Sequence, residues 1–425
     1  LVFSTFLDYY TGIQIEKSTN EKGRKFWFWL SIVVNLGFLG VFKYFNFFSA
    51  SFAQLLTSVG FKASPILLDV ILPVGISFYT FHGLSYVIDI YYKRIKAEYN
   101  FVDYSLFVSY FPLLVAGPIE RATHLLPQVK VQRSFDLEKA KEGLAQFVWG
   151  LVKKVVIADT CATYANAVFD NYPSMNSLSL MLGAIYFAFQ IYGDFSGYSD
   201  MALGMSKLFG IDLLKNFNYP YFSRDIAEFW RRWHISLSSW FRDYLYIPLG
   251  GSQGGMWFKI RNTFIIFLVS GFWHGANWTY VVWGLLNAIY FLPLLVLQKN
   301  RNNTGPVVVN FDWKGLQTVV NILITFLLST IAWVFFRAKS ITDAVLYLKQ
   351  MVINGDFSSQ YLSNERYNYE ILLLIGVFVV VEWNNRNRVE PLSGRYSLVK
   401  FGLAIAAIMA LGTFSDYKEF IYFQF

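Results

Sequence analysis

Two of the four histidines in this 425-residue chain lie in motifs suited to acid–base chemistry. His274 lies within Trp273 to Trp278 (WHGANW), at the end of an apolar run. Burying an imidazole there is costly unless the ring is hydrogen-bonded or used. A neutral imidazole could accept the proton of an attacking hydroxyl, a general-base role worth ~10² to 10⁴ in rate. If the helix continues, Asn277 lies on the same face one turn further on. A histidine held by a neighbouring helix is the alternative, and spacing alone does not decide between the two.

His234 follows a charged and aromatic stretch and precedes a run of serines. On a helix, Glu228 would pair with Arg224 and Arg232, each four residues away. Ser238 lies one turn beyond His234 and is placed to fix its ring. The alternative interpretation is an amphipathic helix at the membrane surface, anchored by basic and aromatic side chains.

Two carboxylates, Asp194 and Asp200, interrupt another apolar stretch. Acids inside a membrane are costly and usually face a partner or a cavity. Tyr198 shares a helix face with Asp194, while Gly193 and Gly197 form a small-residue pair suited to close helix packing. We predict a structural ion network here rather than direct catalysis. The expected cationic partners are Arg231, Arg232 and Arg242.

The remaining candidates carry weaker signals. His82 lies inside a long apolar stretch, which favours packing, and His124 lies in a basic loop, which favours solvation. Cys161 is the only cysteine, so the chain has no intrachain disulfide, and no Cys or His pair has the spacing of a structural zinc site. We expect no bound metal and no bound cofactor.

The composition is that of a membrane protein. Hydrophobic residues make up 55% of the chain and charged residues 15%, against roughly 25% charged in soluble domains. The formal charge of +8 comes from short basic clusters between apolar stretches, the pattern of cytoplasmic loops. No basic stripe or nucleic-acid module accompanies it, so we expect no nucleic-acid partner.

Stretches near the length of about 20 residues that a bilayer crossing requires predict an all-α polytopic protein surrounded by lipid. The predicted spans are 26–48, 66–92, 143–169, 178–206, 278–298, 315–336, 369–384 and 397–414. The segment 261–275 is short for a crossing. We find no internal repeat and no long linker, and predict one membrane domain over 1–425 that lacks N-terminal spans.

Lysines and arginines orient the predicted loops, because cytoplasmic loops keep the excess. The basic loops lie near 17–25, 93–141, 207–232, 259–261, 299–301 and 386–395, where Arg386, Arg388 and Arg395 occur. They fall on one side only if 101–117 and 233–250 dip into the membrane without crossing. Such backbone is tolerated where it is buried in protein or lines a wet cavity, so these dips are candidate walls of a site.

Several motifs in order resemble the membrane-bound O-acyltransferase family, in its bacterial alginate O-acetylation branch. They are Leu72 to Phe81, Ala116 to Glu120, Gln190 to Asp200, Asp225 to Gly251, Trp273 to Trp278 and Tyr417 to Phe423. The resemblance covers essentially the whole chain. One departure is His82, which stands where that branch has glutamine.

The resemblance implies a ring of tilted helices with re-entrant segments around a central tunnel, in the bacterial cytoplasmic (inner) membrane. His274 matches the invariant membrane-embedded histidine of the family, and His234 matches the second site position. We expect His274 to be the catalytic base or transient acyl acceptor, and His234 to position the donor carbonyl or tune His274. The residues expected to line or support the site are Trp273, Asn277, Asp194, Tyr198, Asp200, Ser238 and Arg242.

The implied function is acetyl transfer from a cytoplasmic thioester such as acetyl-CoA, for O-acetylation of an exported polysaccharide such as alginate. A separate acetyltransferase on the outer, periplasmic face is the expected partner. D-alanyl transfer to teichoic acid is the rival within the family. A rival of another class is a proton-coupled transporter in which Asp194, Asp200 and the histidines form a relay. The absence of an inverted repeat weakens the transporter.

Overall fold

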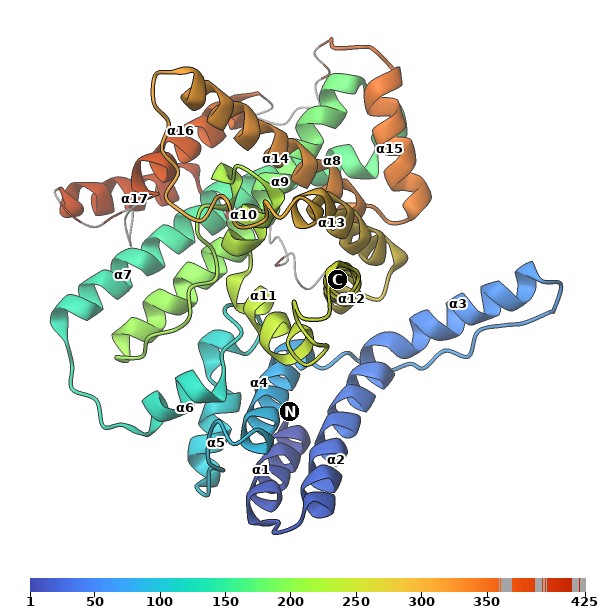
Figure 1. The fold of residues 1–425 in the computed structure, drawn as a ribbon. Coiled ribbons are helices and arrows are strands. Elements are labelled where there is room, and N and C mark those ends of the chain that lie inside the picture. The colour runs from blue at the N-terminus through green and yellow to red at the C-terminus, as the bar shows by residue number, and fades with distance from the viewer. Residues whose placement is uncertain are drawn as a thin grey trace. The chain divides into compact units, whose positions relative to one another are not determined.

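The computed structural model describes residues 1–358, 360, 369–386, 392, 394, 396–414 and 420, and all the regular elements among them are helices (Figure 1). The predicted loop residues Arg388 and Arg395, and all of 417–423 except Phe420, lie outside these residues. The chain divides into two compact units, which are described separately. The first comprises 1–134, 211–214 and 275–277, and the second comprises 135–210, 215–274 and 278–425.

The first unit is built around a buried carboxylate. Its helices are α1 (Val2–Lys17), α2 (Glu21–Leu39), the π-helical turn η1 (Gly40–Tyr44), α3 (Phe45–Ser58), α4 (Ile76–Tyr91), α5 (Phe101–Val108), the 3₁₀ turn η2 (Phe111–Leu113) and α6 (Ala122–Lys130). Asp8 on α1 accepts hydrogen bonds from Ser31 (2.6 Å) and Asn35 (2.7 Å) on α2. Gly83 on α4 leaves room for this carboxyl group, because a Cβ there would collide with Asp8. The polar cluster therefore fixes how α1, α2 and α4 pack.

The prediction of a continuous span over 66–92 is wrong for its first ten residues. No regular helix forms over 62–75, and α4 begins only at Ile76. Pro65 and Pro73 lack the backbone N–H that a helix interior requires, and Gly75 adopts a left-handed φ of 75° immediately before α4. The 16 residues of α4 reach roughly 24 Å, less than the ~30 Å of a bilayer core.

The second unit contains the longer apolar helices and both candidate histidines. Its elements are α7 (Leu137–Leu151), the π-helical η3 (Val152–Ala158), α8 (Asp159–Asp170), the 3₁₀ turn η4 (Tyr172–Ser174), α9 (Ser177–Leu208), the 3₁₀ turn η5 (Pro220–Phe222), α10 (Ile226–Arg232), α11 (Ile235–Phe241), the π-helical η6 (Arg242–Tyr246), α12 (Met256–His274), α13 (Trp278–Val296), α14 (Trp313–Arg337), α15 (Ile341–Ile353), α16 (Glu370–Asn385) and α17 (Ser397–Leu411).

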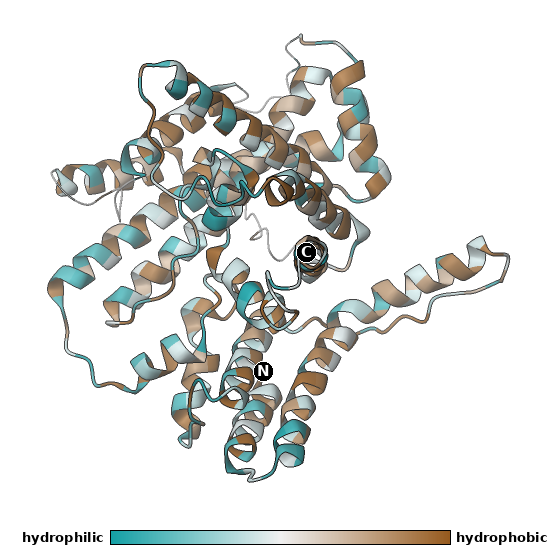
Figure 2. Cartoon of the chain, viewed as in Figure 1, coloured by the Kyte–Doolittle hydropathy of each residue, from teal (hydrophilic) through white to brown (hydrophobic). Residues whose placement is uncertain are grey.

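By length and composition, four helical stretches among the described residues could cross a membrane. They are the continuous α2–η1–α3, α9, α13 and α14. Figure 2 shows apolar residues along much of each of these helices. The predicted spans 369–384 and 397–414 correspond to α16 and α17, while 143–169 lies within the run α7–η3–α8. The segment at 261–275 belongs to α12, which at 19 residues is longer than predicted.

The small-residue contact predicted on α9 is present. A Cβ on Gly197 would lie 2.7 Å from the carbonyl oxygen of Gly150 on α7, and one on Gly193 would lie 2.9 Å from that of Lys153. Only glycine allows backbones to approach this closely. Close packing of α9 against α7 and η3 sets the positions of the polar side chains that α9 carries.

The two predicted dips consist of short elements. Segment 101–117 contains α5 and η2, and segment 233–250 contains α11 and η6. The longest continuous helical run, α11 with η6, spans the twelve residues 235–246 and is about 18 Å long, too short to cross a bilayer core. Their re-entrant depth, the ring of helices and the central tunnel remain predictions.

Candidate active site

His234 occupies a strained position at the start of α11. Its backbone is left-handed (φ 43°, ψ 53°), which is uncommon for a residue with a side chain. The preceding segment 216–218 runs alongside, because Ile235 N donates to Asn216 O (2.8 Å) and Asn218 N donates to Arg232 O (2.9 Å). Strain of this kind persists only where the surroundings enforce it, and it is concentrated at functional sites.

Asn216 fixes the ring of His234. Its Oδ1 lies 3.0 Å from His234 Nδ1 and accepts hydrogen bonds from Ser236 Oγ (2.8 Å) and Ser236 N (3.4 Å). Its Nδ2 donates to Ser199 Oγ on α9 (3.0 Å). A backbone N–H can only donate, so the atom facing Ser236 N is the amide oxygen. His234 Nδ1 therefore carries a hydrogen and donates it to Asn216.

The other ring nitrogen of His234 is available for chemistry. In a neutral imidazole with its hydrogen on Nδ1, Nε2 holds a lone pair. His234 is 1% exposed, and Nε2 has no hydrogen-bond partner among the residues that the structure describes. Such an atom accepts a hydrogen bond or a proton. With this tautomer, Nε2 could donate to a carbonyl oxygen only if the ring were protonated, and the carbonyl-positioning role stays a prediction.

His274 ends α12 inside an aromatic cage. Its ring centroid lies 5.0 Å from that of Trp273, 5.1 Å from Trp283 and 5.2 Å from Phe336. The α12–α13 pair that holds it packs closely at Gly271, where a Cβ would collide with the backbone of α13. The cage is rigid on both sides of the histidine as a result.

Trp273 connects the two histidines. Its indole lies 6.2 Å from the ring of His234, nearly edge-on, and it also contacts His274. The structure thus brings together three of the predicted site residues, although 40 positions separate the two histidines in the sequence.

The predicted helical placement of Asn277 beside His274 is wrong. The helix ends at His274, and α13 begins at Trp278, so 275–277 form a turn between the two helices. Asn277 belongs to the first unit, whereas His274 belongs to the second. Gly275 disfavours continuation of the helix, because glycine loses more backbone entropy in a helix than other residues do.

The acids of α9 form the predicted ion network, but with lysines. Lys154 Nζ lies 2.7 Å from Asp194 and 2.9 Å from Asp159. Lys153 Nζ lies 3.0 Å from Asp200 and 3.2 Å from Glu382, whose carboxylate also accepts from Tyr192 (2.8 Å). The π-helical geometry of η3 holds both lysines. The network connects η3, α8, α9 and α16.

The arginines predicted as partners are engaged elsewhere. Arg232 pairs with Glu228 (2.8 Å), Arg231 donates to the carbonyl oxygens of Asn300 and Asn303, and exposed Arg242 pairs with its neighbour Asp243 (2.7 Å). Of the other supporting residues, Tyr198 packs on Phe420 at 5.3 Å. Ser238 contributes its backbone N–H to His234 O, while Asn216 holds the ring.

The remaining candidates lie away from this cage. His124 is not simply solvated, because its Nδ1 lies 2.8 Å from the fully buried Glu120. This hydrogen bond raises the pKa of His124 above its usual 6.5. His82 is buried against Phe107 at 5.6 Å, and Cys161 is buried in α8.

Sequence reasoning did not identify Asn216, Lys153, Lys154 or Glu382. The lysines did give a signal, because two adjacent cations inside the apolar stretch 143–169 require partners. Asn216 gave none. Its position 18 residues before His234 follows no helical or strand period.

Comparisons with known proteins identify the family of the chain. Residues 28–337 match the model of the membrane-bound O-acyltransferase family. The chain is 42% identical over 342 residues to the probable alginate O-acetylase AlgI of Pseudomonas aeruginosa. The aligned region covers 80% of this chain and 63% of that protein. It is 37% identical over 391 residues to the peptidoglycan O-acetyltransferase of Helicobacter pylori, covering 86% and 72%.

A more distant relative is the teichoic acid D-alanyltransferase of Streptococcus thermophilus. The identity is 31% over 235 residues, covering 51% of this chain and 55% of that protein. The family match spans most of the chain and includes both histidines. Together with the long apolar helices, these similarities place the chain in the membrane-bound O-acyltransferase family.

Proposed function

We propose that this chain is an O-acetyltransferase of the bacterial inner membrane, which moves an acetyl group from a cytoplasmic thioester for O-acetylation of an exported polysaccharide. The observation that carries the proposal is the contact of His234 and His274 with the same indole, that of Trp273. Relatives named for O-acetylation of alginate and of peptidoglycan support the acetyl group and the polysaccharide class.

The reaction needs a base and a proton donor in turn. The hydroxyl oxygen of the acceptor attacks the thioester carbonyl, a C–O bond forms and the C–S bond breaks. His274 takes the hydroxyl proton and returns it to the leaving thiolate, so that ester and thiol are the products. His234 Nε2 accepts a hydrogen bond from a neighbouring hydroxyl of the acceptor and so orients the acceptor for attack.

The test is acetyl transfer by purified protein in proteoliposomes with labelled acetyl-CoA, an acceptor polysaccharide and the partner acetyltransferase. His274→Ala should abolish transfer while the protein still inserts and purifies normally. His234→Ala should lower transfer less completely. Normal polymer acetylation by His274→Ala in a deletion strain would refute the assignment of the base.

The direction of transfer follows from the charge of the loops. Basic residues near 207–232 and 251–261 favour the cytoplasmic side, and they would attract a donor that carries phosphates. Inside-out vesicles should consume added acetyl-CoA, whereas sealed right-side-out vesicles should do so only after permeabilisation. Equal consumption by both sealed preparations would contradict this direction.

D-alanyl transfer to teichoic acid is the second candidate, and the similarity to a D-alanyltransferase is what favours it. Its donor is a carrier protein rather than acetyl-CoA. Offering both labelled donors to the same proteoliposomes separates the two functions. We propose acetyl transfer because the O-acetylation relatives cover more of this chain at higher identity.

A further inference from the structure

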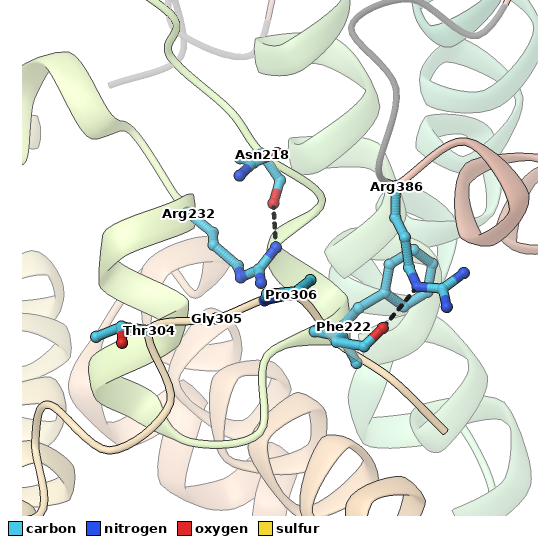
Figure 3. Close-up of a pocket in the computed structure, with 8 residues that line it drawn as sticks. Asn218, Phe222, Arg232, Thr304, Gly305, Pro306 and Arg386 are labelled. Carbon is cyan, nitrogen blue, oxygen red and sulfur yellow. Dashed lines mark hydrogen bonds between the residues drawn. The ribbon is translucent and has the colours of Figure 1, made fainter. Parts of the chain in front are cut away.

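A cavity of ≈ 200 Å³ lies in the second unit, beside the segment that precedes His234 (Figure 3). It is lined by Asn218, Phe222 and Arg232, by the loop 304–307 between α13 and α14, and by Arg386 just after α16. At about 30 Å³ per water, this volume equals roughly seven waters. It is below the roughly 300 Å³ at which pockets enclose a whole drug-sized ligand. The cavity therefore suits a small group, or one end of a larger molecule.

Positive charge exceeds negative charge around this cavity. The buried carboxylate of Glu228 is shared by Arg224 (2.9 Å) and Arg232 (2.8 Å). Burial alone would raise the pKa of Glu228, but these guanidinium groups outweigh it and hold that pKa below its usual value. One negative charge thus faces two positive charges. Arg386 adds a third from another helix.

Among the described residues, Arg386 donates its hydrogen bonds to neutral groups. Its Nε donates to Val307 O (3.0 Å) and its Nη1 donates to Trp383 O (2.6 Å), while the guanidinium stacks 3.9 Å from the Trp383 ring. Figure 3 shows Arg232 and Arg386 on opposite sides of Pro306. An anion in the cavity would lie between the guanidinium group of Arg232, which is paired with Glu228, and that of Arg386, which donates to neutral carbonyl oxygens.

The loop that forms the wall of the cavity is clamped at both ends. Arg224 Nη2 donates to Gly305 O (2.9 Å), and Arg386 Nε donates to Val307 O (3.0 Å). Pro306 between them has a fixed φ. Two arginines and a proline therefore hold the wall in place before any ligand binds, which lowers the entropic cost of binding.

We propose that this cavity binds a phosphate group of the acyl donor and so anchors the donor next to the acyl-transfer site. Guanidinium groups suit phosphate because their planar forks donate paired hydrogen bonds to its oxygens. The inference rests on the proposed function for the identity of the donor. The phosphate chemistry rests on the cavity alone.

The cavity is connected to His234 through the backbone. The hydrogen bonds from Asn218 N to Arg232 O and from Ile235 N to Asn216 O hold the two segments side by side. Asn218 and Arg232 line the cavity. Asn216 lies two residues before Asn218, and His234 lies two residues after Arg232. A phosphate in the cavity would stabilise the same pair of segments that holds His234.

Calorimetric binding of coenzyme A to the full chain in phosphatidylcholine nanodiscs tests the proposal. Arg386→Gln removes the charge at the cavity, and Arg301→Gln removes an exposed charge from the 297–312 loop that does not line it. We expect Arg386→Gln to weaken binding by about tenfold to hundredfold and Arg301→Gln to change it less than about twofold. Arg386→Lys retains the charge without the fork and should lie between. Pantetheine, which has no phosphate, should not distinguish the variants.

Equal coenzyme A affinity of Arg386→Gln and Arg301→Gln would overturn the proposal. An anionic lipid headgroup is the other source of phosphate, so the titration is repeated in phosphatidylglycerol nanodiscs. If phosphatidylglycerol suppresses coenzyme A binding by the wild type but not by Arg386→Gln, a lipid occupies the cavity and the donor assignment is wrong. Binding does not require turnover, so His274→Ala should bind coenzyme A normally. If the wild type binds coenzyme A but transfers no acetyl group, the result counts against the proposed function and not against the cavity.

Discussion

Replacing Asn216 by leucine removes the group that sets the tautomer of His234. The change deletes the hydrogen bonds to His234 Nδ1, Ser236 Oγ and Ser199 Oγ while keeping a similar side-chain volume. The imidazole can then carry its hydrogen on either nitrogen and rotate. We therefore expect fewer molecules to present a lone pair at Nε2.

The magnitude follows from these three bonds. At about 0.5–1.5 kcal/mol net for each, the loss of stability is on the order of 2–4 kcal/mol. The catalytic loss is of a different kind, because an imidazole in the wrong tautomer cannot accept the orienting hydrogen bond at Nε2. We expect kcat for acetyl transfer to fall roughly 10²-fold, the size of the loss that misplacing a reacting group can cause. The KM for acetyl-CoA should change little.

A matched control separates stability from chemistry. Asn35 is as buried as Asn216 and makes three side-chain hydrogen bonds in the first unit, to Asp8 and Ser31, which matches Asn216 apart from its long contact with Ser236 N (3.4 Å). Asn35→Leu should lower the melting temperature by a similar amount and leave kcat per folded molecule close to normal. Asn216→Asp keeps an acceptor for His234 Nδ1 and should retain more activity than Asn216→Leu. If Asn216→Leu has normal kcat, or if both leucine variants lose kcat equally, the tautomer argument is wrong.

Two further predictions concern stability, measured by thermal unfolding of the purified protein. Lys153→Met should lower the free energy of unfolding by about 3–5 kcal/mol. Asp200→Asn should cost less, because Lys153 pairs with two carboxylates and still has Glu382 when Asp200 is neutralised. The reverse ranking would contradict the network. The pKa of His124 in the folded protein is raised above 6.5. The contribution of His124 to the free energy of unfolding should therefore be fully present below pH 6.5 and be lost as the pH rises through the folded pKa. The difference in melting temperature between the wild type and His124→Gln should shrink in that direction, and a growing difference at alkaline pH would refute it.

Motifs on continuous helices were readable from the sequence. α9 and α14 lie within a few residues of their predicted bounds, because long apolar stretches leave one solution in a bilayer. The histidines were also identifiable, since an imidazole in an apolar run demands an explanation. Their common contact with Trp273 was not predictable, because it depends on how α11 and α12 are placed in space.

Helix breaks were the harder feature, although two had local signals. Pro65, Pro73 and Gly75 indicated that 66–75 would not be helical, and Gly275 marked the end of α12. Apolar content outweighed these signals in the prediction. A stretch can be apolar enough for a membrane without being helical, provided that the surrounding protein satisfies its backbone.

The choice of lysine over arginine in the ion network has a physical reason in the packing of α9. Gly150 and Gly197 bring α7 and α9 into backbone contact, and η3 follows directly after α7. Lys153 and Lys154 are thereby already beside the acids of α9, whereas the predicted arginines lie on α10 and η6. The same helix carries Ser199, which accepts from Asn216. Any shift of α9 along α7 would therefore move the ion network and the seat of His234 together. We propose that the buried acids serve the chemistry indirectly, by fixing the helix against which the His234–Asn216 pair is held.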